Sequence, residues 1–309
     1  FLYPLARFWG VPAFPRLFFQ IDTPPGLENC RIIRMWISRP RLLIAPLFCA
    51  AAVLAFSQSQ GTIERLSPEA NTIIPANASL ESVASGFKWS EGPIWIHQGY
   101  LLFADIPNNR IHKWEGPNKV SIFLEPSGYT GSAPYGGPEP GSNAMTLDAK
   151  GRLTLAGHAR RNVWRLESMN PHGQITVLAD SYEGKKLNSP NDLVYKSDGS
   201  LYFTDPPYGL RTQDDKDPHK ELKFNGVYRI KGATAQKPGS APNRSNLELL
   251  VKDLPRPNGI AFSPDEKYLY VSNSGPRFWM RYTVNADGSV SNGKVFYDVS
   301  NDPAPGGPD

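Results

Sequence analysis

Four segments of this chain repeat one pattern of polar and apolar residues. Each begins with a polar head and continues as an apolar strand, a turn, a second apolar strand, another turn and a third strand. The segments are SEGPIWIHQGYLLFADIPNNRIHKW from Ser90, SNAMTLDAKGRLTLAGHARRNVWRL from Ser142, PNDLVYKSDGSLYFTDPPYGL from Pro190 with NGVYRI after an insertion, and PNGIAFSPDEKYLYVSNSGPRFWMRYTV from Pro257. The strict alternation over 268–273 is typical of a β-strand with two different faces.

The turns and outer segments extend this pattern to four strands per repeat. Gly, Asp and Pro favour hairpins at 148–151, 197–199 and 264–267. The apolar segments VSIFLEP, QITVLAD and LELLVKD each follow a third strand and fit a fourth, outer one. Four strands per roughly fifty residues, repeated along the chain, predict a β-propeller. Thirty Pro and 27 Gly agree with an all-β protein that has many turns.

The first 57 residues have a different character from the repeats. Met35 opens a stretch in which Arg39 and Arg41 precede an apolar run from Leu42 to Phe56, the layout of a secretory signal peptide. A membrane anchor is the alternative, although the run is shorter than the roughly 20 apolar residues of a spanning helix. We therefore expect an upstream segment of unclear status at 1–34, a signal peptide at 35–57, a linker at 58–79 and a partial β-propeller at 80–309. The protein would then be exported, to the periplasm or the medium.

The leader also accounts for the charge and the cysteines. It holds six Arg and two acidic residues, a net of +4, which equals the +4 of the whole chain. The remainder is formally neutral, so nothing favours nucleic-acid binding. Cys30 and Cys49 are the only cysteines, so the repeats contain no thiol for a disulfide, a metal site or a nucleophile. We expect no membrane partner after signal cleavage, and the sequence leaves the oligomeric state open.

The polar heads of the repeats form a candidate site. In a propeller the innermost strands line a central channel, so their first residues should meet at one mouth. The heads are Glu91, Asn143, Asn191 and Asn258, and Asp309 in GGPD follows one repeat later. Carboxylate and amide oxygens without thiolates suit a hard cation. The alternative is that each is a turn residue that bonds its own backbone.

The motifs SEGPIW, SPNDLVYKSDGSLYFTDPPYG, PNGIAFSPDEKYLYVSN and GGPD, in this order, closely resemble those of the senescence marker protein and gluconolactonase family of six-bladed β-propeller lactonases. The resemblance covers roughly residues 80–309 and implies that Glu91, Asn258 and Asp309 bind one divalent cation. It matches Asn191 to an asparagine beside metal and substrate, with Asn143 as a second substrate-binding candidate. The family continues beyond this Asp, which implies four complete blades, the start of a fifth and a C-terminally truncated chain.

The resemblance implies hydrolysis of a sugar-acid lactone, a small-molecule substrate. The cation, expected to be Ca²⁺ with Mg²⁺, Mn²⁺ or Zn²⁺ as alternatives, would polarise the lactone carbonyl, and Asp309 is the candidate catalytic base. A lactonase or arylesterase for a different ester is one alternative function. A non-catalytic propeller that binds a peptide or sugar is another. A quinone-dependent propeller dehydrogenase would require more blades and a Trp-rich repeat that this chain lacks.

Two further residues and two insertions lie outside the polar heads of the repeats. His158 follows an inner strand and either borders the pocket or is a structural histidine. Asp205, in TDPPYG, either forms a turn or contributes to the site or a second cation. The insertion EPSGYTGSAPYGGPEPGS should overhang the channel mouth, where Tyr129 and Tyr135 would belong to a lid. The charged insertion RTQDDKDPHKELKFNG is interpreted as a solvated loop.

Overall fold

The computed structural model describes residues 18–21, 30–35, 63–65, 67–303 and 306–309. The chain divides into two compact units, 1–21 with 31–86 and 22–30 with 87–309. In the first unit, strands β1 (Phe18–Ile21) and β2 (Cys30–Met35) pair antiparallel, and β3 (Leu80–Phe87) completes a three-stranded sheet. A four-residue helix, α1 (Ala70–Ile73), precedes β3. The expected signal peptide lies outside the described residues except for Met35.

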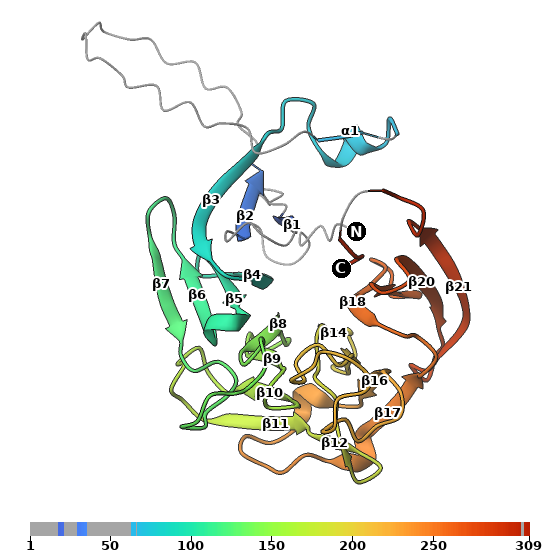
Figure 1. The fold of residues 1–309 in the computed structure, drawn as a ribbon. Coiled ribbons are helices and arrows are strands. Elements are labelled where there is room, and N and C mark those ends of the chain that lie inside the picture. The colour runs from blue at the N-terminus through green and yellow to red at the C-terminus, as the bar shows by residue number, and fades with distance from the viewer. Residues whose placement is uncertain (1–17, 22–29, 36–62, 66, 304–305) are drawn as a thin grey trace, which may run out of the picture. The chain divides into compact units, whose positions relative to one another are not determined.

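Four four-stranded antiparallel sheets make up the second unit (Figure 1). The first is β4 (Ser90–Ile96), β5 (Tyr100–Asp105), β6 (Arg110–Trp114) and β7 (Val120–Leu124). The second is β8 (Ser142–Leu147), β9 (Leu153–Gly157), β10 (Asn162–Leu166) and β11 (Ile175–Ala179). The third is β14 (Leu193–Tyr195), β15 (Leu201–Asp205), β16 (Gly226–Ile230) and β17 (Leu247–Val251). The fourth is β18 (Pro257–Phe262), β19 (Tyr268–Asn273), β20 (Phe278–Val284) and β21 (Val290–Asp298).

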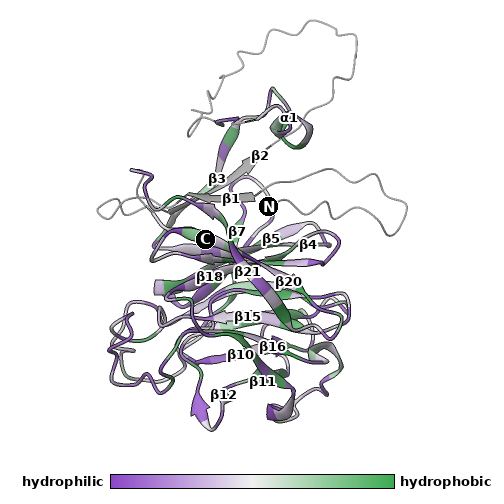
Figure 2. Ribbon diagram, turned by 90° about the vertical axis from the view of Figure 1, so that its right-hand side faces the viewer, coloured by the Kyte–Doolittle hydropathy of each residue, from purple (hydrophilic) through white to green (hydrophobic). Residues whose placement is uncertain are grey.

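Short elements connect these sheets. They are the hairpin β12 (Ser181–Tyr182) with β13 (Lys185–Lys186) and the 3-10 turns η1 (Ile106–Asn108), η2 (Ala233–Ala235) and η3 (Arg244–Asn246). Both lysines of β13 are exposed, and Figure 2 shows this hairpin as hydrophilic. In the described residues, α1 is the single α-helix. The prediction of an all-β fold is confirmed, and so are the outer strands expected in the first three repeats.

The sheets are arranged as blades around a common centre. Within the second unit, β4 contacts β8, β8 contacts β14, and β14 contacts β18, so the four first strands are neighbours. Figure 1 shows these strands on the inner side and β7, β11, β17 and β21 on the outer side. Because neighbouring sheets face each other, each of the three apolar clusters draws its residues from two successive sheets. This packing holds the heads of the inner strands close together.

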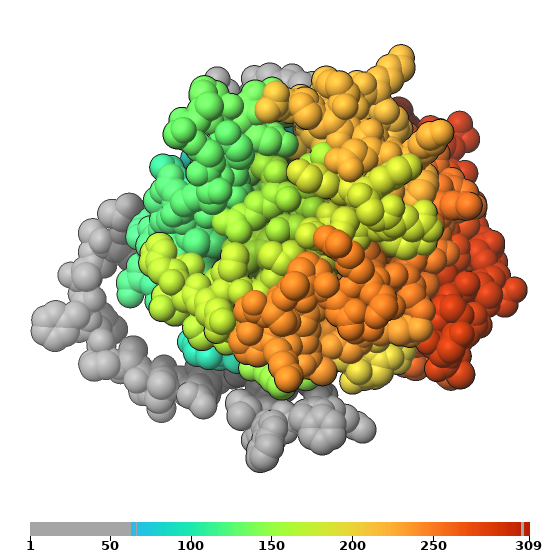
Figure 3. Space-filling view, turned by 90° about the horizontal axis from the view of Figure 1, so that it is seen from below, coloured from blue at the N-terminus to red at the C-terminus, as the bar shows by residue number. Residues whose placement is uncertain are grey.

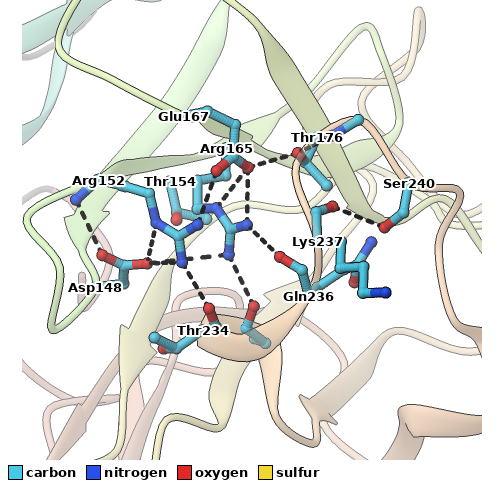
Figure 4. Close-up of polar contacts among 12 residues, drawn as sticks. Asp148, Arg152, Thr154, Arg165, Glu167, Thr176, Thr234, Gln236, Lys237 and Ser240 are labelled. Carbon is cyan, nitrogen blue, oxygen red and sulfur yellow. Dashed lines mark hydrogen bonds and ion pairs between the residues drawn. The ribbon is translucent and has the colours of Figure 1, made fainter.

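A buried ion cluster joins the second and third sheets (Figure 4). Arg165 is fully buried and forms an ion pair with Glu167 at 2.7 Å. Arg152 forms ion pairs with Asp148 at 2.6 Å and with Glu167 at 2.7 Å. Both arginines also donate to backbone carbonyls of 233–236, the connection that follows β16. In Figure 3 the orange surface of this connection lies against the yellow-green surface of the second sheet.

Candidate functional site

Three asparagines from successive inner strands form one hydrogen-bonded row, which we call the amide row: Asn143, Asn191 and Asn258. The Nδ2 of Asn143 donates to Oδ1 of Asn191 at 2.7 Å, and the Nδ2 of Asn191 donates to Oδ1 of Asn258. Asn143 and Asn191 are each 4% exposed. The structure therefore brings together three of the five predicted heads, although they are up to 115 positions apart along the chain (258 − 143).

Bulges at the strand starts explain how these heads are aimed. The register shifts between Glu91 and Ile94 in β4, between Ser142 and Met145 in β8, and between Pro257 and Ile260 in β18. A bulge bends the strand and redirects one side chain, which here happens at the polar head. Asn191 lies two residues before β14, where its backbone N–H donates to the carbonyl of Thr204 at 2.9 Å.

Backbone hydrogen bonds fix the spacing between neighbouring heads. The N–H of Ala144 donates to the carbonyl of Asn191 at 3.1 Å. The hydroxyl of Thr204 donates to the carbonyl of Asn258 at 2.6 Å. Because each of these bonds joins neighbouring sheets, the backbone of the sheets holds the amide row in place. Such support is what a binding or catalytic site requires.

Glu91 lies beside the row at the first sheet. Its neighbour Gly92 has φ +53°, and a Cβ there would lie 2.5 Å from the Cα of Ala144, so this position accepts only glycine. The close approach brings β4 against the backbone of Asn143. The carboxylate of Glu91 accepts a hydrogen bond from the indole N–H of Trp89 at 3.3 Å, and the residue is half-buried.

Asp309 lies at the other side of the row. Its backbone carbon is 2.6 Å from the position that a Cβ on Gly259 would take, so Asp309 lies against the residue that follows Asn258. Burial raises the pKa of the Tyr208 phenol, and the carboxylates of Asp309 and Glu139 raise it further. Asp309 itself is exposed, whereas Pro308 is buried.

His158 lies behind the row and is fully buried. Its Nε2 is 3.3 Å from Nδ2 of Asn143 and 3.2 Å from Oδ1 of Asn191. Its Nδ1 is 2.8 Å from Oε2 of Glu139. His158 therefore contacts two of the predicted heads, and its full burial and hydrogen bonds fit either interpretation of this residue.

The sequence interpretation missed Glu139. This residue lies in the insertion before β8, and it is the only carboxylate between Pro126 and Ser142. A lone carboxylate between two prolines could have been singled out from the sequence as a candidate site residue. Its second oxygen accepts a hydrogen bond from the side chain of Gln213 at 2.7 Å. The insertion at 211–226 thus contacts the first insertion, which the expectation of a solvated loop did not include.

The first insertion packs on the PPYG segment, which lies against His158. Tyr135 donates from its hydroxyl to the carbonyl of Gly209, and the rings of Tyr129 and Tyr135 are 5.3 Å apart. A Cβ on Gly209 would lie 2.3 Å from the Cβ of His158. Only glycine permits this approach, which explains the glycine of the PPYG motif.

Asp205 binds the backbone of the segment before β14. Its carboxylate oxygens accept the N–H groups of Asn188 and Ser189, both at 2.8 Å. In the first and fourth sheets Asp105 and Asn273 accept N–H groups from the loop before the inner strand in the same way. Burial raises the pKa of Asp205 to about 7, while its backbone hydrogen bonds oppose that rise. These contacts support the turn interpretation of Asp205.

The donor set of the row fits a hard cation. The predicted set would contribute the carboxylates of Glu91 and Asp309 and the amide oxygen of Asn258. In the same row Oδ1 of Asn143 is buried and receives no hydrogen bond from the protein. Oxygen donors of this kind suit Ca²⁺ or Mg²⁺. Among the residues that the structure describes, no group of three or more His, Cys, Asp or Glu is arranged to hold a metal ion. The predicted set, with two carboxylates, does not depend on such a group.

None of the described helices is long and apolar enough to cross a membrane.

A family model described as the SMP-30/gluconolactonase/LRE-like region matches residues 89–309. The chain belongs to this family. A gluconolactonase from Zymomonas mobilis is 41% identical over 233 residues, which cover 74% of this chain and 61% of that protein. A lactonohydrolase from Aspergillus oryzae is 29% identical over 127 residues, 40% of this chain and 26% of its own length. This chain therefore spans less than two thirds of either curated relative.

Solved structures give the same family assignment. The gluconolactonase of Xanthomonas campestris is 31% identical and superimposes with a TM-score of 0.52 over 67% of this chain and 62% of that one. An X-ray structure of a gluconolactonase candidate, also 31% identical, gives a TM-score of 0.63 over 78% of this chain and 74% of its own. A luciferin-regenerating enzyme shares the fold at 21% identity and a TM-score of 0.51.

Proposed function

We propose that this protein hydrolyses a sugar-acid lactone with the help of one divalent cation. The amide row carries the proposal, because three side-chain amides from three strands converge between two carboxylate positions. The lactonase names of its relatives support the reaction class. A convergent set of oxygen donors supports the cation.

Glu91, Asn258 and Asp309 would hold the cation, with Ca²⁺ as the first candidate and Mg²⁺, Mn²⁺ or Zn²⁺ as the others. When bound, the cation would polarise the lactone carbonyl. Asn143 and Asn191 would hydrogen-bond the substrate and keep its carbonyl carbon in reach of water. Their burial strengthens such bonds, because little water competes for them.

Asp309 is the proposed general base. Its carboxylate would accept a proton from the attacking water while the water oxygen bonds to the carbonyl carbon. The ring carbon–oxygen bond then breaks, the ring oxygen takes up the proton, and an open-chain hydroxy acid results. Atoms and charges balance without any other reactant. The position of Asp309 against Gly259 supports this role, since Asn258 is the adjacent residue.

Two broader predictions accompany this function. We propose that the four sheets are blades of a six-bladed propeller, on the basis of their common register and the family motifs. We also propose export of the mature protein, on the basis of the pattern at 35–57. Cell fractionation with an antibody against the repeats tests export, because an uncleaved cytoplasmic protein would contradict it.

The decisive experiment measures acid release from glucono-1,5-lactone. The purified protein is treated with chelator, and release is followed before and after addition of each cation. Release that returns with one cation and is absent in Glu91→Ala supports the proposal. Glu115→Ala, at an exposed glutamate paired with Lys113, is the matched control and should behave as the parent protein. A folded protein that releases no acid with any cation overturns the proposal and favours another ester or a binding module.

A further inference from the structure

Glu139 and His158 form a buried pair behind the amide row, and neither is among the residues that the family motifs match. The Nδ1 of His158 is 2.8 Å from Oε2 of Glu139, an ion-pair distance at which Nδ1 carries the proton, although the two atoms are not aligned as a hydrogen bond. The opposite ring nitrogen, Nε2, then faces the row. A histidine fixed in this way by a carboxylate has a defined ring orientation.

The ring orientation determines how the Asn143 amide is turned. With a proton on Nδ1 alone, Nε2 offers a lone pair, and Nδ2 of Asn143 at 3.3 Å can donate to it. Oδ1 of Asn191, 3.2 Å from the same nitrogen, then receives no hydrogen bond from the ring. The same NH₂ group donates to Oδ1 of Asn191 at 2.7 Å. Both of its hydrogens are therefore used. Consequently Oδ1 of Asn143 is turned away from His158, and it is buried without a donor from the protein.

An unsatisfied buried acceptor is unfavourable unless it serves a ligand. The acceptor requires a hydrogen-bond donor, and a sugar-acid lactone carries several hydroxyl groups that can donate. An apolar lactone of the same ring size carries none. The oxygen is therefore suited to distinguish hydroxylated from plain lactones.

We propose that Glu139 and His158 are positioning residues that turn the Asn143 oxygen toward a hydroxyl group of the substrate and so select polyhydroxylated lactones. The inference rests on the proposed function for its substrate class. It also gives the two insertions a role. Glu139 is held by Gln213 at 2.7 Å, and Gly209 packs directly on His158.

The test compares two substrates and one ligand. The kcat/KM is measured for glucono-1,5-lactone and for δ-valerolactone, which has no hydroxyl group. The dissociation constant of D-gluconate is measured by calorimetry. In His158→Leu and in Glu139→Leu, the preference for gluconolactone over valerolactone should fall about tenfold, the effect of one lost neutral hydrogen bond. Gluconate binding should weaken by a similar factor.

His158→Gln is the rescue variant, because its amide oxygen can accept from Asn143 near the position of Nε2. It should restore much of the preference, which a role in packing alone would not predict. His112→Leu is the matched control. His112 is also buried beside a carboxylate, with its Nε2 3.8 Å from Asp105, but it lies in the first sheet away from the row. Its substitution should leave the substrate preference unchanged.

The outcomes separate this inference from the proposed function. If the parent protein hydrolyses no lactone, the proposed function fails, and gluconate binding by the parent and the variants still tests the positioning pair. If hydrolysis occurs but the preference and the gluconate affinity are the same in the folded leucine variants, the positioning inference is wrong. Equal loss on both lactones in His158→Leu and in His158→Gln also contradicts it.

Discussion

The side-chain amide of Asn143 donates to the amide oxygen of Asn191 across 2.7 Å, which joins the second and third sheets at the proposed site. Asn191→Ala removes the middle of the amide row. We expect lactone hydrolysis to fall by about 10²–10³ in kcat, the usual effect of losing a group that stabilises developing charge. Steady-state kinetics at saturating cation measure it. Asn170→Ala, at an exposed turn, is the control, and an equal loss in both variants would argue against a specific role for the row.

Cation binding should stabilise the folded protein. A ligand that binds only the native state at about 100 times its dissociation constant adds about 2.7 kcal/mol to the free energy of unfolding. We expect Ca²⁺ to raise the midpoint of thermal unfolding and a chelator to reverse this. Asn258→Ala should reduce the shift. A shift of the same size in Asn258→Ala, or with Na⁺ at matched ionic strength, would speak against these ligands.

Asp205 should make folding less favourable as the pH rises. Burial raises the pKa of its carboxyl to about 7, above the ordinary value for Asp. Between about pH 4 and pH 7 the folded state then retains a proton that the unfolded chain has lost, so the free energy of unfolding falls with pH. Asp205→Asn should flatten this slope, as measured by urea unfolding at several pH values.

Asp105 provides a control of opposite sign. Burial alone would raise its pKa, but nearby His112 and hydrogen bonds from Asn108 and the backbone outweigh burial and lower it. Its contribution to stability is present above the ordinary carboxyl pKa and is lost as the pH falls below about 4. Asp105→Asn should therefore alter the acid limb alone. If both variants change the same limb, the assignment of the two slopes is incorrect.

The buried ion cluster should contribute to stability and not to catalysis. Arg165→Met leaves the carboxylate of Glu167 with one partner fewer in a buried position. Breaking a buried pair costs about 3–5 kcal/mol in the free energy of unfolding. Lys267→Met, in an exposed pair with Asp265 at 3.2 Å, should change it by less than about 1 kcal/mol. Denaturant unfolding compares the two, and a small effect in Arg165→Met would contradict the prediction.

Much of the secondary structure of the second unit could be predicted from local sequence patterns. Hairpin turns, strand alternation and the outer strands of three repeats are encoded by neighbouring residues, so they could be located before the structure. The fourth outer strand, β21, was expected from the repeat but was not located, because its segment VSNGKVFYD mixes polar residues with its apolar ones. Strands β1 and β2, which pair with each other, were also missed, since no periodicity marks them.

The sequence by itself determined the repeat, the family and the identity of the polar heads, because strand period and turn chemistry are local properties. Tertiary structure alone decided which heads bond to one another, that Asp205 serves the backbone, and that Glu139 reaches His158. These contacts join residues far apart along the chain, and they depend on how the sheets pack. No local pattern specifies that geometry, whereas the burial of apolar surface between successive sheets does.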